Sequence, residues 1–160
     1  MLNSYKAEAV TVAAEASRGS LGIPASPGSP ETVPIWQKVT LPHCFNAEDA
    51  VDPDVNYYQG PGWYKTLLTI DNPYADGRVV LDFEGAGQKT KVYVYTTLVG
   101  EHTGGYDGWS VDITEAVKSF MADDKLVKRF KGKIPLSIRC DNSRDLEMIP
   151  SFCFRRRASR

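Results

Sequence analysis

The strongest constraint on the fold is a series of short segments in which apolar and polar residues alternate. In the clearest of them, Val79, Leu81 and Phe83 alternate with Asp82 and Glu84. A period of two sends successive side chains to opposite faces, so one face of the segment is buried and the other is wet. Turn residues such as Asp, Asn, Gly and Pro separate the segments. Strands are therefore predicted at 35–41, 63–70, 79–84, 91–95 and 134–140.

One segment has a helical period instead. Asp112 and Glu115 have the spacing of a capping box, and an apolar stripe at helical spacing follows, made of Ile113, Ala116, Val117, Phe120 and Met121. The whole pattern predicts an all-β fold, a sandwich or barrel of antiparallel strands, with one short helix that plugs one end.

Composition divides the chain into three parts. Four of the ten prolines lie between positions 24 and 34, so residues 1–34 are predicted to form a Pro/Gly/Ser-rich arm. Residues 35–150 are predicted to form one globular domain. The last part, 151–160, is a basic tail with Arg155, Arg156, Arg157 and Arg160. A chain of 160 residues has no room for a second, catalytic domain.

Charge and hydropathy limit the partners. The formal net charge is −1, and without the four tail arginines it falls to −5, so no nucleic-acid partner is expected. No stretch of about 18 apolar residues could span a membrane. The start of the chain lacks the apolar core of a secretory signal peptide. The location in the cell is left open.

Few residues have catalytic or metal-binding chemistry. The cysteines lack metal or disulfide spacing and are predicted to be free thiols: Cys44, Cys140 and Cys153. With only His43 and His102 as imidazoles, neither a metal nor a cofactor is expected, and His43 either binds substrate or completes a turn. Asp82 and Glu84 would stand about 7 Å apart on one strand face, which permits an inverting carboxylate pair, but a solvated face is the commoner case.

The chain also carries a set of short motifs: Trp36-Gln37-Lys38-Val39-Thr40-Leu41-Pro42-His43, Tyr57-Tyr58-Gln59-Gly60-Pro61-Gly62-Trp63-Tyr64, Leu81-Asp82-Phe83-Glu84-Gly85-Ala86, Val92-Tyr93-Val94, Gly100-Glu101-His102-Thr103-Gly104-Gly105-Tyr106, Asp112-Ile113-Thr114 and Asp141-Asn142-Ser143. In order and spacing they resemble the N-terminal sugar-binding domain of glycoside hydrolase family 2. The resemblance implies a jelly-roll β-sandwich of the galactose-binding type, as in bacterial β-galactosidases, β-mannosidases and β-glucuronidases.

The resemblance also carries an expectation about activity. These enzymes hydrolyse β-glycosidic bonds in carbohydrate metabolism, in the cytoplasm or periplasm. In the family the two catalytic glutamates belong to a downstream TIM barrel that this chain does not contain. The chain is therefore predicted to have no catalytic residue and to be inactive alone.

Four residues are candidates for sugar contact. Asp141 matches an aspartate that contacts a sugar hydroxyl in some relatives, and Asn56 lies where a substrate-facing asparagine is found. Asp141-Asn142-Ser143 is equally a good turn sequence. A different function, a free-standing carbohydrate-binding module, would use Trp109 beside Tyr106 as a stacking surface. The aromatic residues at 57, 58, 63 and 64 either stack on sugars or fill the core.

The chain departs from the family in three places. The aromatic-rich first strand is missing or replaced within 1–34, the turn at 95–97 lacks the residues of a tight hairpin, and the closing strand gives way to the arginine tail. A truncated or frameshifted reading frame would explain the tail, and a genuine solvated basic tail is the alternative. A third functional alternative is a ligand-free structural remnant of a truncated gene. An exposed sheet edge would also favour a homo-oligomer.

Overall fold

The computed structural model describes residues 13–18 at backbone level, 36–70 without positions 48, 50, 52, 53, 55 and 56, and 76–143. The elements are β1 Ala13–Arg18, β2 Gln37–Thr40, β3 Pro61–Leu68, β4 Val80–Phe83, β5 Lys89–Val94, β6 Thr97–Thr103, β7 Trp109–Asp112, α1 Thr114–Met121, α2 Asp124–Arg129 and β8 Ile134–Asp141. One sheet has the order β2-β1-β3-β8-β5-β6, and a smaller one pairs β4 with β7. The strand pairs of the described residues are antiparallel, so the predicted all-β fold is confirmed.

The core lies between the larger sheet, the β4–β7 pair and the first helix. Strand β5 alternates between buried and half-buried residues, with Val92 and Val94 fully buried. Leu136 of β8 lies opposite Val94 and belongs to the same apolar cluster as Val111 and Phe120. The other face of the sheet turns away from this cluster, because successive side chains of a strand point to opposite sides.

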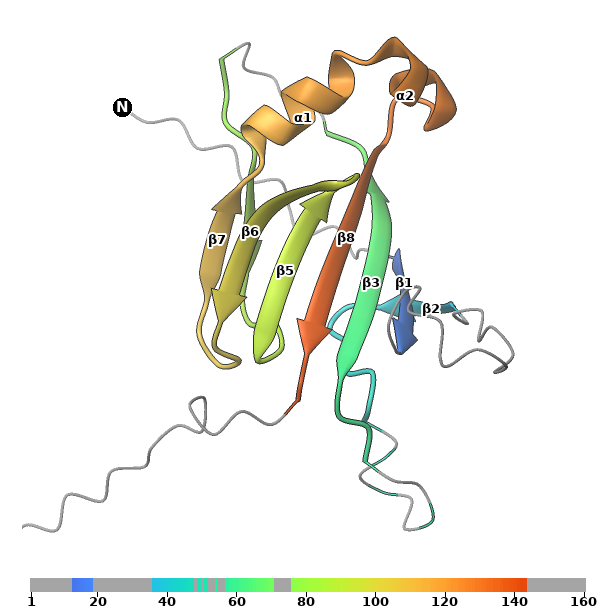
Figure 1. The fold of residues 1–160 in the computed structure, drawn as a ribbon, viewed down its shortest axis with the longest axis vertical. Helices are drawn as coiled ribbons and strands as arrows, with labels where there is room; N and C mark the ends of the chain where they lie inside the picture. The colour runs from blue at the N-terminus through green and yellow to red at the C-terminus, as the bar shows by residue number, and fades with distance from the viewer. Residues whose placement is uncertain are drawn as a thin grey trace, which may run out of the picture.

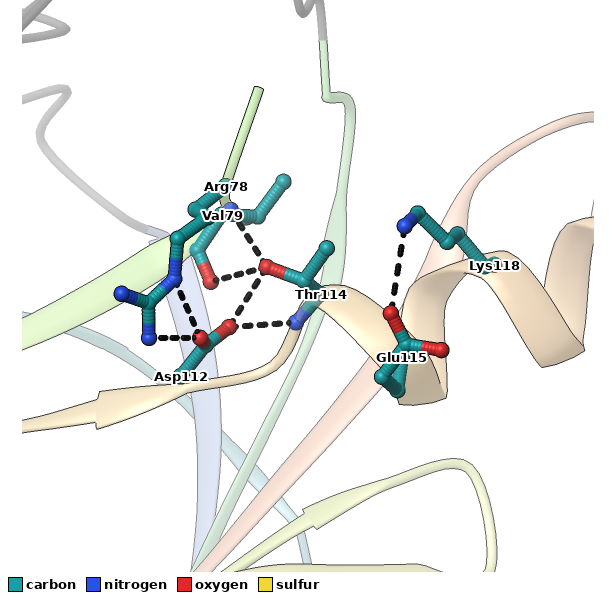
Figure 2. Close-up of polar contacts among 6 residues, drawn as sticks. All are labelled: Arg78, Val79, Asp112, Thr114, Glu115 and Lys118. Carbon is teal, nitrogen blue, oxygen red and sulfur yellow. Dashed lines mark hydrogen bonds and ion pairs between the residues drawn. The ribbon is translucent and has the colours of Figure 1, made fainter. Parts of the chain in front are cut away.

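Thr114 joins the first helix to the small sheet (Figure 2). Its Oγ1 accepts a hydrogen bond from Val79 N at 2.8 Å and donates one to Asp112 Oδ1 at 2.5 Å. Asp112 also accepts from Thr114 N at 2.9 Å and forms an ion pair with Arg78. The hydrogen bonds from Thr114, and then the one from Arg78, lower the pKa of Asp112 from 3.8 to about 2.

The helical part differs from the prediction in two details. Asp112 and Glu115 do not form a capping box, because the helix starts one residue later, with Ile113 as N-cap and no side-chain cap bond. Met121, assigned to the apolar stripe, is 46% exposed.

A second helix, α2, was not predicted. Asp123 caps it by accepting from the backbone of Lys125 and Leu126. This helix has only six residues and none of them is buried, so its sequence shows no apolar stripe at helical spacing.

The first strand lies inside the segment 1–34 that the sequence assigns to an arm. Strand β1 is an interior strand, paired with β2 on one side and β3 on the other. Its sequence, Ala-Ala-Glu-Ala-Ser-Arg, is poor in the β-branched and aromatic residues of strands. Backbone hydrogen bonds to strands on both sides stabilise the extended conformation, although the local sequence does not favour it. The first strand is therefore replaced rather than missing.

The turn between β5 and β6 was predicted to be longer than a type I′ hairpin turn or different from it in shape. It is a two-residue loop of a different shape, since a type I′ turn needs a positive φ at both central residues. Val94 pairs directly with Thr97, and of the two loop residues only Tyr95 has a positive φ, +54°. The Tyr95 ring contacts Phe120 and Phe130, with centroids 5.9 and 5.8 Å away. Its backbone N–H also donates to Pro135 O at 2.8 Å. Tertiary contacts thus hold a side-chain-bearing residue where glycine or asparagine is usual.

Candidate functional site

The segments that could touch a ligand gather at the end of the sandwich opposite the two helices (Figure 1). We call this the loop end and define it by residues 57–60, 84–88, 104–108 and 141–143. Strands β4, β6 and β8 run toward it, and β3, β5 and β7 start from it. Contacts join neighbouring segments, as when Gly104 N donates to Gln88 O at 2.9 Å. Two of the four predicted site residues, Asp141 and Tyr106, lie here.

Asp141 ends β8 and is 9% exposed. Its Oδ1 accepts from Ser143 N at 2.9 Å and from Ser143 Oγ at 2.5 Å, and its Oδ2 accepts from Arg139 Nη2 at 2.7 Å. Burial alone would raise the pKa of Asp141, but these hydrogen bonds outweigh burial and lower it. Asp141 is thus a fixed, ionised acceptor that also forms the turn its sequence suggests.

Asn142 is the residue at this end that sequence reasoning missed. Its Oδ1 accepts from Gly60 N at 2.7 Å, and its Nδ2 donates to Tyr58 O at 3.0 Å. Asp49 Oδ2 holds the same stretch from another side, accepting from Tyr58 N at 3.0 Å. The segment just after Asn56 is thereby fixed to the end of β8. Asn56 itself lies outside the described residues. No local signal could reveal a contact between positions more than 80 residues apart.

Trp109 stacks against two other rings, an arrangement that the sequence could not show. Phe83 covers one side, with ring centroids 4.4 Å apart and planes 8° apart, and His102 contacts the ring at 4.8 Å and 12°. The ring area that these two side chains cover is not open to a sugar. Tyr106, in contrast, is 94% exposed. The two residues therefore do not form one stacking surface.

A second aromatic group surrounds the start of β3. His43 Nδ1 lies 3.1 Å from Tyr64 Oη, and the Tyr64 hydroxyl donates to His43 O at 3.3 Å. Burial raises the pKa of Tyr64. Phe45 packs edge-on against Tyr58. Tyr58 and Tyr64 thus serve packing, while Trp63, between them in the sequence, faces the other side of the sheet.

The groups with catalytic or metal-binding chemistry are dispersed. Asp82 and Glu84 are both exposed. Cys44 is exposed and Cys140 is buried, both as free thiols, and Cys153 lies outside the described residues. Among the described residues, no three His, Cys, Asp or Glu side chains come close enough to hold a metal. None of the described helices is long and apolar enough to cross a membrane.

Comparison with known proteins gives consistent matches. Residues 14–130 match the family model described as "Glycosyl hydrolases family 2, sugar binding domain". The crystal structure of Parabacteroides merdae β-glucuronidase is 72% identical and covers 88% of this chain and 18% of that protein, with a TM-score of 0.78. Bacteroides uniformis β-glucuronidase 3 is 64% identical, and the match covers 89% of this chain and 19% of that protein, with a TM-score of 0.79.

A curated relative extends the comparison. The Bacteroides fragilis β-glucuronidase is 30% identical over 114 residues, which make up 71% of this chain and 15% of that protein. The chain thus spans less than a fifth of the length of the relatives named here. The family match begins at residue 14, inside β1.

Proposed function

Because the chain belongs to the sugar-binding domain family of the family 2 glycosyl hydrolases, we propose that it serves as the non-catalytic sugar-binding domain of a bacterial β-glucuronidase. The observation that carries the proposal is the 72% identity to the matching part of the Parabacteroides merdae β-glucuronidase. The parent reaction is hydrolysis of a β-glycosidic bond, with both catalytic carboxylates supplied from outside this chain.

The loop end is the part of the domain that we assign to the sugar pocket. Asp141 is held by Arg139 and Ser143, so its carboxylate is positioned before any ligand arrives. An ionised, fixed acceptor suits a sugar hydroxyl, and the absence of reorganisation favours binding. Asn142 is a positioning residue, because it fixes the segment that follows Asn56.

A domain exchange tests the role directly. Residues 13–143 of this chain would replace the matching segment of the Parabacteroides merdae enzyme, and hydrolysis of p-nitrophenyl β-glucuronide would be measured. We expect the chimera to remain active and the same enzyme without the domain to be inactive. The matched control carries the corresponding segment of a 25% identical Bacteroides uniformis β-glucuronidase, which should support less activity. A folded but inactive chimera would contradict the proposal.

Asp141→Asn in the active chimera separates a sugar contact from a structural role. If Asp141 contacts the sugar, KM rises while the melting temperature of Asp141→Asn stays close to that of Ser143→Ala, which loses a hydrogen bond to the same carboxylate. A lower melting temperature with unchanged KM would show that Asp141 only maintains the turn. The chain alone should release no nitrophenol from β-glucuronides, β-galactosides or β-mannosides.

Self-association through a sheet edge remains a prediction. In the described part of the chain, β4 pairs with β7 alone, and Val80 of β4 is 45% exposed. A strand edge without a partner strand, with an exposed apolar residue on it, favours pairing with another chain. Light scattering after size-exclusion chromatography would test it, with Val80→Lys expected to shift a dimer toward monomer.

A further inference from the structure

The face of the larger sheet that turns away from the core has its own chemistry. We call it the outer face. One row across it, set by the strand register, runs Trp63, Arg139, Lys91 and Glu101. The next row contains Lys65, Ser137 and Tyr93. Directly paired residues of neighbouring strands share a face. These residues therefore lie opposite Val92, Val94 and Leu136, on the side away from β4, β7 and α1.

Two aromatic rings meet at the centre of the outer face. Trp63 and Tyr93 belong to strands separated by β8, and so by about 10 Å of sheet. Their ring centroids nevertheless lie 5.8 Å apart, with planes inclined by 32°. Both side chains therefore lean toward each other over β8, where Ser137 offers little bulk. The result is a half-buried aromatic surface formed by two adjacent rings.

Cations surround this aromatic surface. Lys65 Nζ lies 3.9 Å from the ring centroid of Trp36, a cation–π contact that adds a third ring. Cationic positions on the outer face are Lys38, Lys65, Lys89, Lys91 and Arg139. Acidic positions in the same rows are Glu15, Glu101 and Asp141. Two of these cations are paired with acids of the same face, because Lys91 Nζ lies 2.8 Å from Glu101 Oε1 and Arg139 Nη2 lies 2.7 Å from Asp141 Oδ2. The five cations still outnumber the three acids, which is a local asymmetry in a chain with a net charge of −1.

We propose that the outer face is a binding surface for an anionic polysaccharide, with sugar rings on Trp63 and Tyr93 and uronate carboxylates beside Lys65 and Lys91. At Lys91 the uronate competes with Glu101, whose ion pair with this lysine is solvent-exposed. The pyranose ring presents C–H groups that suit aromatic faces, and carboxylates accept charge-assisted hydrogen bonds from ammonium groups. The choice of a polysaccharide over another polyanion rests on the proposed function. The surface is separate from the loop end, so the two proposals can fail independently.

The test is native electrophoresis of the full chain through gels that contain polygalacturonate, with neutral pullulan as the second matrix. We expect retardation by polygalacturonate that decreases as salt is added, because counterions screen the lysines. Trp63→Leu with Tyr93→Leu keeps apolar side chains at both positions, and circular dichroism would verify its folding. We expect this variant to bind about tenfold more weakly, a factor that corresponds to about 1.4 kcal/mol.

Two further variants make the result specific. Lys65→Gln with Lys91→Gln should reduce binding to polygalacturonate. Tyr106→Ala removes a more exposed aromatic residue at the loop end and should leave binding unchanged. Equal retardation of wild type and the Trp63/Tyr93 variant would overturn the proposal, as would no retardation at all. Equally strong binding of single-stranded oligothymidylate would also overturn it, in favour of a nonspecific polyanion surface. An active chimera that fails to bind polygalacturonate would leave the domain's role intact.

Discussion

Replacement of Thr114 by valine removes one hydroxyl from the joint between the small sheet and α1 while keeping the side-chain size. The residue is 8% exposed, and its Oγ1 is the acceptor for Val79 N and a donor to Asp112. Valine leaves the Val79 N–H without this partner in a part-buried setting. An unsatisfied buried donor costs about 1–3 kcal/mol, so we expect a loss of about 2 kcal/mol in the free energy of unfolding.

Urea and thermal unfolding followed by circular dichroism would measure the loss. For a chain of this size, about 2 kcal/mol corresponds to a fall of about 4–8 °C in Tm. Thr114→Ser is the matched control, because it keeps the hydroxyl and loses only a methyl group, worth about 0.8 kcal/mol. The reasoning is refuted if the valine variant is as stable as the serine variant or more so, since packing rather than the hydrogen bonds would then hold the joint.

Three further predictions concern other parts of the fold. Asp112 has a folded-state pKa of about 2 against 3.8, so its stabilisation is complete above about pH 4 and is lost as the pH falls through 2; acid titration of wild type and Asp112→Asn should converge over that range. Tyr95→Gly removes the strain of a positive φ, which is worth about 1 kcal/mol, but it also loses the ring contacts with Phe120 and Phe130, which are worth about 3 kcal/mol. Chemical denaturation should therefore show a fall of about 2 kcal/mol in the free energy of unfolding, and not a gain. Gly100→Ala places a Cβ 2.5 Å from Val111 Cγ2 and should lower the free energy of unfolding by about 1–3 kcal/mol through overpacking. The control is Gly132→Ala, whose Cβ meets no atom within 4 Å, so it should lose only the stability that alanine gives up at a φ of +75°. An equal fall in Tm in both variants would argue against the steric cause.

The sequence predicts the positions of strands that have one buried face and one exposed face. Val80–Phe83 and Ile134–Asp141 fall within a residue or two of the predicted segments, because burial on one side imposes a period of two on the sequence. The first helix was readable for the same kind of reason, since Val117 and Phe120 recur at helical spacing on its buried face. Strand β1 carries no such pattern, and its place in the sheet is set by its two neighbours.

The sequence by itself determined the fold class and the family, because alternation of apolar residues, turn residues and motif order are all properties of neighbours along the chain. Only the tertiary structure decided where the candidate residues lie and what they contact. It stacked Trp109 against Phe83 and His102, left Tyr106 in solvent, and brought Asn142 to Gly60. It also placed Trp63 beside Tyr93 across β8. Such contacts join residues from distant strands, and their geometry depends on strand pairing and side-chain packing that no local pattern records.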